Sequence, residues 1–267
     1  MDISKDKIKL ISTDLDGTLL NDKKEISDYT KNILNILMND YKIELIFSSG
    51  RPYEGIINYK RILKNNNDSI IFNGSNIVDK EGKVIYKRTI EEAIGESIVK
   101  LSEKYNVCIH VYDNGRYIVS KEDFPIKSYV QKDQSIPAIY GLHHINNYEF
   151  DKMLILGERE ILDNLKMEID SKFDVHSCFS GPFSLEITSK ETNKGNALKW
   201  ICNNKGIDIK EVIAFGDNFN DIEMIEYAGI GVAMANAEEE LKQKADYTTL
   251  SNEEDGVGRF LKNIFEL

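Results

Sequence analysis

Short apolar runs alternate with amphipathic segments at both ends of the chain, and this alternation restricts the fold more than any other feature. A short apolar run is typical of a strand that is buried on both faces. The runs lie at residues 8–13, 43–47, 69–72, 212–215 and 230–233. Amphipathic segments such as 26–40 separate them and predict helices. We therefore expect an α/β fold with a parallel, doubly wound sheet, whose ligand crevice lies beyond the carboxyl ends of the strands.

The middle of the chain has a different pattern. Gly82 predicts a hairpin turn, and residues 91–105 and 158–169 predict helices. Strands are expected at residues 107–112, 117–120 and 152–156 and around Val175 and Leu185. These elements predict a smaller α+β region in which helices cover one face of an open sheet.

Two carboxylates follow the first apolar run, in the segment Asp14-Leu15-Asp16-Gly17-Thr18. Side chains two residues apart on an extended chain point to the same side, and Gly17 lets the backbone turn directly afterwards. We therefore expect Asp14 and Asp16 to face one site. Because close carboxylates repel each other, the pair predicts a cation, and Mg²⁺ fits since it binds carboxylate and phosphate oxygens together. The alternative is a pair of ordinary polar groups at a strand end.

Two further segments supply groups that suit an anion. Ser48-Ser49-Gly50-Arg51-Pro52 offers a hydroxyl, backbone N–H groups and a guanidinium where a strand passes into a helix. Lys194 lies in the first turn of a predicted helix that Thr192 or Asn193 caps. A cation at that end opposes the helix dipole, which indicates negative charge nearby. Alone, each segment is also typical of a plain turn or a solvated lysine.

A fourth segment, Gly216-Asp217-Asn218-Phe219-Asn220-Asp221, follows the apolar run 212–215. It packs two carboxylates and two amides into one strand-to-helix loop, which suits a metal and the groups that orient its ligands. A surface turn is the alternative. All four segments fall at the ends of predicted strands or the starts of predicted helices, so they converge on one site.

Together, in this order and spacing, the four segments resemble the motifs of the haloacid dehalogenase superfamily of phosphohydrolases. The resemblance is strongest to the Cof-type branch of subclass IIB, whose C2-type cap domain is inserted between the second and third motifs. Asn73-Gly74 and Leu185-Glu186-Ile187 match the same branch. The resemblance implies a catalytic core formed by residues 1–82 and 185–267, and a cap that sets substrate specificity at residues 83–184.

The resemblance also implies a mechanism, that of a Mg²⁺-dependent phosphatase. Asp14 attacks phosphorus and forms an aspartyl-phosphate, while Lys194 neutralises the equatorial oxygens and holds Asp14 near the phosphate. Asp16 protonates the leaving alcohol and then deprotonates the hydrolytic water. That role requires a raised pKa of Asp16 in the free enzyme or in the complex.

The implied ligands come from all four segments. For the metal they are the carboxylate of Asp14, the backbone carbonyl of Asp16 and the carboxylate of Asp217. Asp221 either orients Lys194 or a metal-bound water, or contacts the metal itself. For the phosphate they are Lys194, Ser49, the N–H groups of Leu15 and Gly50, and Asn220. Arg51 either joins them or pairs with an acidic side chain.

Charge and composition limit the partners. The net charge of −11 argues against a broad basic surface for nucleic acid or for an anionic membrane. No apolar run is long enough to cross a membrane and no basic, apolar leader begins the chain, so we expect a soluble cytoplasmic protein. The expected partner is a small phosphorylated metabolite such as a sugar phosphate, and the expected state is a monomer or weak homodimer. Cys108, Cys178 and Cys202 have no paired spacing and predict buried free thiols.

Two other functions stay open. Eukaryotic phosphomannomutases share this cap type and a similar Asp-x-Asp-Gly-Thr motif, and a mutase would exchange phosphoryl groups through a hexose bisphosphate with little net phosphate release. A non-enzymatic sensor would bind a phosphometabolite in the same crevice but would have no use for proton transfer by Asp16. The segments 48–52 and 216–221 resemble the phosphatase branch more than the mutase.

Overall fold

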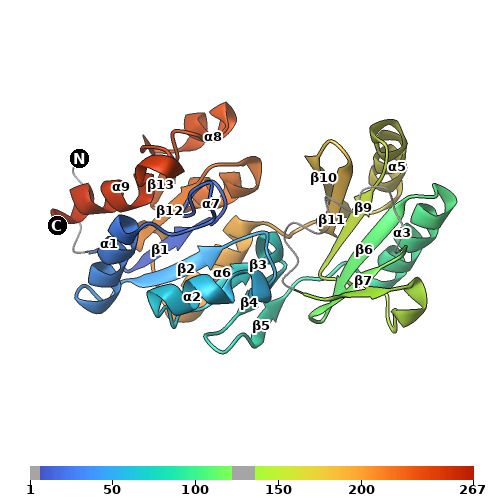
Figure 1. The fold of residues 1–267 in the computed structure, drawn as a ribbon, viewed down its shortest axis with the longest axis horizontal. Helices are drawn as coiled ribbons and strands as arrows, with labels where there is room; N and C mark the ends of the chain where they lie inside the picture. The colour runs from blue at the N-terminus through green and yellow to red at the C-terminus, as the bar shows by residue number, and fades with distance from the viewer. Residues whose placement is uncertain (1–6, 122–135) are drawn as a thin grey trace. The chain divides into compact units, whose positions relative to one another are not determined.

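The computed structural model describes residues 7–121 and 136–267, which belong to two compact units (Figure 1). Unit 1 consists of Met1–Ile85 and Asn193–Leu267, and unit 2 is the insertion Tyr86–Thr192. The insertion therefore ends at Thr192 rather than at Ser184, the limit expected from the sequence. The physical reason is that β11 (Ser184–Ser189) is hydrogen-bonded into the sheet of unit 2.

Unit 1 is built on one sheet, which has eight strands in the described residues. Its strand order is β14-β13-β12-β1-β2-β3-β4-β5. The pairs from β14 to β3 are parallel, whereas β4 runs antiparallel to β3. The strands are β1 (Leu10–Thr13), β2 (Glu44–Ser48), β3 (Ser69–Ile71), β4 (Asn76–Val78), β5 (Val84–Lys87), β12 (Val212–Gly216), β13 (Ile230–Ala233) and β14 (Tyr247–Thr248).

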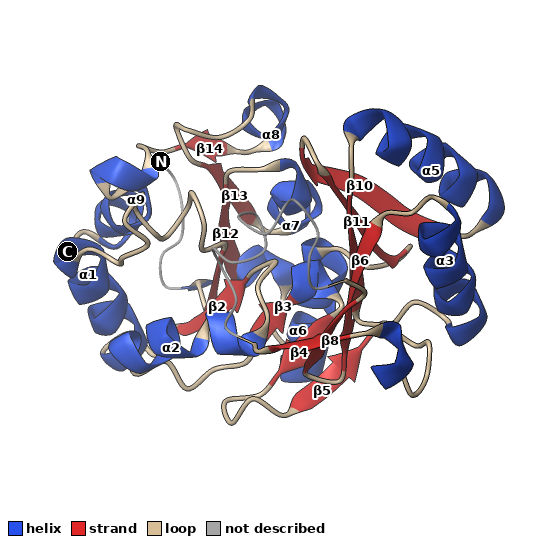
Figure 2. Cartoon of the chain, turned by 45° about the vertical axis from the view of Figure 1, so that its right-hand side comes forward, coloured by secondary structure: helices blue, strands red, loops and turns tan. Residues whose placement is uncertain are grey.

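Helices cover both faces of this sheet. They are α1 (Asp28–Asn39), α2 (Ile57–Leu63), α6 (Lys194–Lys205), α7 (Ile222–Tyr227), α8 (Glu239–Lys244) and α9 (Gly256–Phe265). In Figure 2, α1 and α9 lie on one side of β12 and β13, and α6 and α7 lie on the other. Parallel strands with helices on both faces form the doubly wound α/β sheet that the sequence predicts, and that prediction is confirmed.

The local sequence explains these elements. Because helices cover both faces, β1 is buried along its whole length and appears in the sequence as a continuous apolar run. The helix α1 follows Ser27, whose hydroxyl oxygen accepts a hydrogen bond from the Thr30 N–H at 3.0 Å. Its buried residues recur at helical spacing, and include Ile33, Leu34 and Leu37.

Unit 2 has a six-stranded sheet in its described residues, with strand order β10-β11-β9-β6-β7-β8. Neighbouring strands are antiparallel except β7 and β8. Its other elements are α3 (Glu92–Lys104), β6 (Cys108–Asp113), β7 (Arg116–Val119), β8 (Ala138–Tyr140), β9 (Lys152–Leu156), α5 (Arg159–Lys172) and β10 (Val175–Gly181). An apolar core that includes Ile98 of α3, Ile155 of β9 and Leu165 of α5 joins the helices to one face of the sheet. The structure thus has the α+β insertion that the sequence predicts.

Two smaller expectations concern the cysteines and the membrane. All three cysteines are free, as expected; Cys108 and Cys202 are buried, whereas Cys178 is only partly buried. Within residues 7–121 and 136–267, no helix combines the length and the apolar character needed to cross a membrane.

Candidate active site

The carboxyl ends of three adjacent strands bring three of the motifs together. In the sheet of unit 1, β1 is hydrogen-bonded to β2 on one side and to β12 on the other. Asp14 follows β1 directly, Ser49 follows β2, and Asp217 follows β12. Parallel strands end at the same edge of a sheet, so segments that are far apart in the sequence meet there.

Lys194 is a fully buried cation between two carboxylates. It is the first residue of α6, after Asn193, whose side chain accepts a hydrogen bond from the Asn196 N–H. Its Nζ lies 2.6 Å from Asp14 Oδ1 and 2.6 Å from Asp221 Oδ1. Burial lowers the pKa of Lys194, but the two carboxylates raise it overall, so the lysine keeps its charge. They also offset the helix dipole, which opposes a cation at this position.

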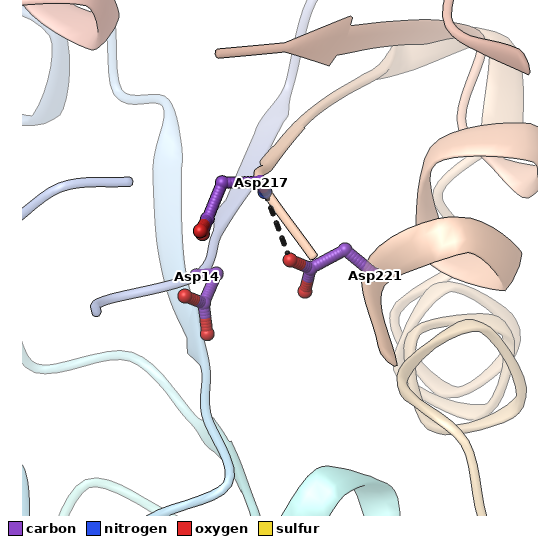
Figure 3. A group of neighbouring side chains, drawn as sticks. All are labelled: Asp14, Asp217 and Asp221. Carbon is purple, nitrogen blue, oxygen red and sulfur yellow. Dashed lines mark hydrogen bonds between the residues drawn. The ribbon is translucent and has the colours of Figure 1, made fainter. Parts of the chain in front are cut away.

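Asp14, Asp217 and Asp221 form an acidic cluster (Figure 3). Each offers a carboxylate oxygen, and these oxygens lie within 4.8 Å of one another. Burial raises the pKa of Asp14 and of Asp217, and the charge of Asp221 raises both further. Lys194 acts in the opposite direction, yet the pKa of Asp217 still rises to about 6. The pKa of Asp14 rises to about 8, so one lysine does not suffice, and a further positive charge is needed to keep Asp14 ionised at neutral pH.

Asp221 uses both of its oxygens within the protein. Its Oδ1 accepts from Lys194 Nζ, and its Oδ2 accepts from the backbone N–H groups of Asp217 at 3.0 Å and Asn218 at 3.1 Å. The dashed line in Figure 3 marks the bond to Asp217. Asp221 is fully buried, so it fixes the lysine and the loop after β12 at the same time.

Asp14 and Asp217 each use only one oxygen. Asp14 Oδ1 accepts from Lys194, and Asp217 Oδ1 accepts from Thr18 Oγ1 at 2.7 Å. The second oxygen of each makes no hydrogen bond with any residue that the structure describes. Gly17 lies so close to Asp217 that a Cβ atom there would be 2.4 Å from Oδ2, so only glycine fits. Two carboxylates with one oxygen each to spare fit a hard divalent cation such as Mg²⁺.

Asp16 lies outside the acidic cluster and is held by two cations. Arg51 binds it through two hydrogen bonds, Nε to Oδ2 at 2.6 Å and Nη2 to Oδ1 at 2.7 Å. Lys24 Nζ lies 2.7 Å from Asp16 Oδ1. Burial raises the pKa of Asp16, but these bonds lower it overall to about 2. The expected raised pKa is therefore wrong for the free enzyme, because the cations outweigh burial.

The backbone explains why Asp16 does not join Asp14 in the cluster. The strand ends at Thr13, and the chain then turns, with Gly17 at φ +81° and the Leu20 N–H bonded to the Leu15 carbonyl at 2.8 Å. The rule that side chains two apart share a side applies only to extended chain. The Asp16 carboxylate therefore does not join the acidic cluster, although its charge still raises the pKa of Asp217.

The loop after β2 is closely packed. Ser49 is buried; its N–H donates to the Ile70 carbonyl at 3.0 Å, and its Oγ accepts from the Arg51 N–H at 3.1 Å. Arg51 pairs with Asp16, the second of the two roles expected for it. Gly50 lies against Asn73, whose Oδ1 would be 2.9 Å from a Cβ atom on residue 50. The loop is therefore held against β3 and Asn73, and Arg51 joins it to the segment that follows β1.

Leu15 and Asn220, also expected to bind phosphate, have different surroundings. The Leu15 side chain is fully buried, so this residue can serve a ligand only through its backbone, as expected. Asn220 is exposed, and its Nδ2 donates to Asn73 Oδ1 at 2.9 Å. Of the two, Asn220 alone offers a side chain, and that side chain already has a fixed partner.

Three residues make contacts at the site that the sequence did not assign to them: Thr18 binds Asp217, Lys24 binds Asp16 and Asn73 binds Asn220. Thr18 and Asn73 lie within polar segments that follow predicted strands, so their position was a usable signal. Lys24 gives no such signal, because it lies in a loop of mixed charge and only the fold brings its Nζ to a carboxylate.

Comparison of the sequence with known proteins identifies the same family that the motifs resemble. A family model described as haloacid dehalogenase-like hydrolase matches residues 11–261. The 5-amino-6-(5-phospho-D-ribitylamino)uracil phosphatase YitU of Bacillus subtilis is 32% identical, with 97% of this chain and 98% of that protein covered.

Solved structures agree with this. A haloacid dehalogenase-like hydrolase from Bacteroides thetaiotaomicron has a TM-score of 0.87 at 31% identity, covering 97% of this chain and 100% of that chain. The sugar phosphatase BT4131 of subclass IIB has a TM-score of 0.82 at 26% identity, with the same coverage. The likeness extends over both units, because it covers nearly the whole chain.

Proposed function

Because this chain belongs to the haloacid dehalogenase-like hydrolases and is a phosphatase, we propose that it hydrolyses small phosphomonoesters, sugar phosphates foremost, with Mg²⁺ and through an aspartyl-phosphate on Asp14. The observation that carries this proposal is the buried Lys194 between Asp14 and Asp221. A carboxylate that is held by a lysine, and that keeps one oxygen without a hydrogen bond, is prepared to attack phosphorus.

Asp14 and Lys194 divide the first step between them. The carboxylate of Asp14 forms a bond to phosphorus while the bond from phosphorus to the leaving oxygen breaks. Lys194 stays charged throughout and stabilises the negative charge on the phosphoryl oxygens. The remaining phosphoryl oxygens are bound by Ser49, by the N–H groups of Leu15 and Gly50, and by Asn220.

The residues present fit Mg²⁺. Asp14 and Asp217 would hold it through their carboxylates and Asp16 through its backbone carbonyl, while Asp221 orients Lys194. When bound, the ion supplies the positive charge that the acidic cluster lacks and polarises the phosphoryl group. This support comes from the raised pKa of Asp14 and Asp217, since carboxylates crowded together in a buried site favour a cation.

Asp16 moves the protons. As a carboxylate it accepts a proton from the water that attacks the aspartyl-phosphate. To protonate a leaving alcohol it must first carry a proton, which requires that bound substrate draw Arg51 and Lys24 away from it. Arg51 and Lys24 therefore keep Asp16 ionised until substrate binds.

The substitution Asp16→Asn is expected to lower kcat/KM for a sugar phosphate by about 10²- to 10⁴-fold, the usual contribution of a general acid. The loss should be much smaller for p-nitrophenyl phosphate, whose leaving group needs no proton. Steady-state kinetics on both substrates give the two ratios, because kcat/KM reports the steps up to formation of the aspartyl-phosphate. Asp28→Asn, at a carboxylate whose side chain is 98% exposed, is the control. Equal losses on both substrates would contradict the role of Asp16 as an acid.

We propose that unit 2 selects the substrate. All the residues named above for chemistry lie in unit 1, so Tyr86–Thr192 is available to select the leaving group. A phosphorylated sugar or polyol is supported by two relatives, one named for a phosphoribitylamino substrate and one called a sugar phosphatase. A cytoplasmic location and a monomer or weak homodimer complete the proposal.

The test is phosphate release from a panel of sugar phosphates, nucleotides and p-nitrophenyl phosphate, with Mg²⁺ and with EDTA. We expect release that needs Mg²⁺, falls at least about 100-fold in EDTA and is fastest with a sugar phosphate. Activity that is unaffected by EDTA would contradict the metal. Phosphoryl exchange that depends on a hexose bisphosphate, without net release, would contradict hydrolysis.

A further inference from the structure

The short turn Phe72–Gly74, which follows β3, has an unusual backbone. Phe72 has φ +50° and Asn73 has φ +56°, so two successive residues with side chains adopt the left-handed conformation. Asparagine tolerates this conformation better than most residues, but phenylalanine does not. Such strain persists only where surrounding contacts hold it, and it is found at functional sites more often than elsewhere.

Backbone contacts join this turn to two segments of the site. The Phe72 N–H donates to the Arg51 carbonyl at 3.1 Å, and the Asn73 N–H donates to the Ser49 carbonyl at 3.0 Å. Gly74 lies against the residue before Lys194: a Cβ atom on Gly74 would be 2.2 Å from the Asn193 carbonyl oxygen. The turn therefore touches both the loop after β2 and the start of α6.

The side chain of Asn73 adds a third segment. Its Oδ1 accepts a hydrogen bond from Asn220 Nδ2 at 2.9 Å. The same carboxamide covers Gly50, since a Cβ atom at residue 50 would be 2.9 Å from Oδ1 and 3.3 Å from Nδ2. One asparagine thus fixes the loop after β2 through its backbone and the loop after β12 through its side chain.

On the basis of the phosphatase function above, we propose that Asn73 is a positioning residue of the phosphate site. Its backbone N–H holds Ser49, and its carboxamide holds Asn220, so that both groups reach the same phosphoryl group. Asn73 acts through these two residues. Gly50 is glycine because the carboxamide of Asn73 occupies the space that a Cβ atom would need.

The substitution Asn73→Gly separates the contribution of the Asn73 backbone from that of its side chain. Glycine adopts the left-handed backbone without strain, so only the carboxamide is removed. The probe is inorganic phosphate, measured as a competitive inhibitor of wild type and variant in Mg²⁺. We expect its inhibition constant to rise about tenfold and kcat/KM to fall about tenfold, because Asn220, once released by Asn73, loses its hydrogen bond to the charged phosphate. The midpoint of thermal unfolding should stay close to that of wild type. Asn106→Gly, at an exposed asparagine with φ +53°, is the matched control and should change neither constant.

A double-mutant cycle tests whether Asn73 acts through Asn220. Asn220→Ala should weaken phosphate binding by itself, and Asn73→Gly together with Asn220→Ala should cost clearly less than the product of the two single losses. A second cycle uses Gly50→Ala, which should damage the wild type and be much less harmful in the Asn73→Gly background, where the clashing carboxamide is absent. Independent, multiplicative losses in both cycles would overturn the proposal.

The remaining outcomes are also decisive. A fall in thermal stability with an unchanged inhibition constant for phosphate would show a purely structural asparagine and overturn the proposal. If the wild type releases no phosphate at all, the phosphatase function fails, and phosphate binding is then measured by calorimetry. Equal phosphate affinity in wild type and Asn73→Gly would overturn the positioning role in that case too.

Discussion

Replacement of Asp14 by asparagine is expected to lower kcat by at least about 10⁴-fold, as loss of a covalent nucleophile does in other hydrolases. The substitution keeps the size and shape of the side chain but removes the charged oxygen that attacks phosphorus. Asparagine can still accept a hydrogen bond from Lys194, which lies 2.6 Å from Oδ1. Phosphate release from the best substrate of the panel, with saturating Mg²⁺, measures the loss.

The same variant must be shown to fold. Asp14 is crowded by Asp217 and Asp221, so removal of its charge relieves repulsion and partly offsets the weaker bond to Lys194. We therefore expect a thermal midpoint near that of wild type. Turnover by Asp14→Asn within about tenfold of wild type would contradict nucleophilic attack by this residue.

The substitution Lys194→Met is expected to reduce both activity and stability. The charge of Lys194 stabilises the transferring phosphoryl group, so kcat/KM should fall by about 10³-fold. Its loss also leaves Asp14 and Asp221 buried without their common cation, which should lower the free energy of unfolding by about 3 kcal/mol. Steady-state kinetics and urea unfolding measure the two effects.

A lysine on the same helix gives the matched control. Lys199 is exposed on α6, and Lys199→Met removes the same charge at a distance from the acidic cluster. We expect this variant to keep wild-type kinetics and to lose less than about 0.5 kcal/mol. Similar losses in both lysine variants would show that net charge, rather than the buried ion pairs, is responsible.

The strands and helices could be predicted largely from the sequence. The predicted strands 152–156 and 230–233 have the observed bounds of β9 and β13. Such segments are predictable because a strand buried on both faces must be apolar throughout, and turn residues bound it. The end of the insertion was harder to place, because the sequence around Leu185 indicates a strand but not the sheet that it joins. Only hydrogen bonding to β9 and β10 assigns β11 to unit 2.

In the candidate site, too, some features could be predicted from the sequence and others could not. Positions at strand ends were sufficient to predict that Asp14, Ser49 and Asp217 meet, because the topology of a doubly wound sheet fixes that edge. The partners of Asp16 were not predictable in this way. Arg51 and Lys24 reach it with long, flexible side chains from separate loops, and their combined charge reversed the expected direction of its pKa shift. The positioning role proposed for Asn73 depends on its left-handed backbone conformation, which sequence spacing does not reveal.

The most direct test is to look for the phosphoryl group on Asp14. Asp16→Asn with p-nitrophenyl phosphate is the best combination, because the first step then needs no acid while the second step lacks its base, so the intermediate accumulates. The reaction is stopped with acid during turnover, and the peptides are analysed by mass spectrometry. We expect one phosphoryl group on Asp14, absent when Asp14→Asn is combined with the same change. Turnover with no phosphorylated peptide, or with the group on another residue, would contradict the proposed mechanism.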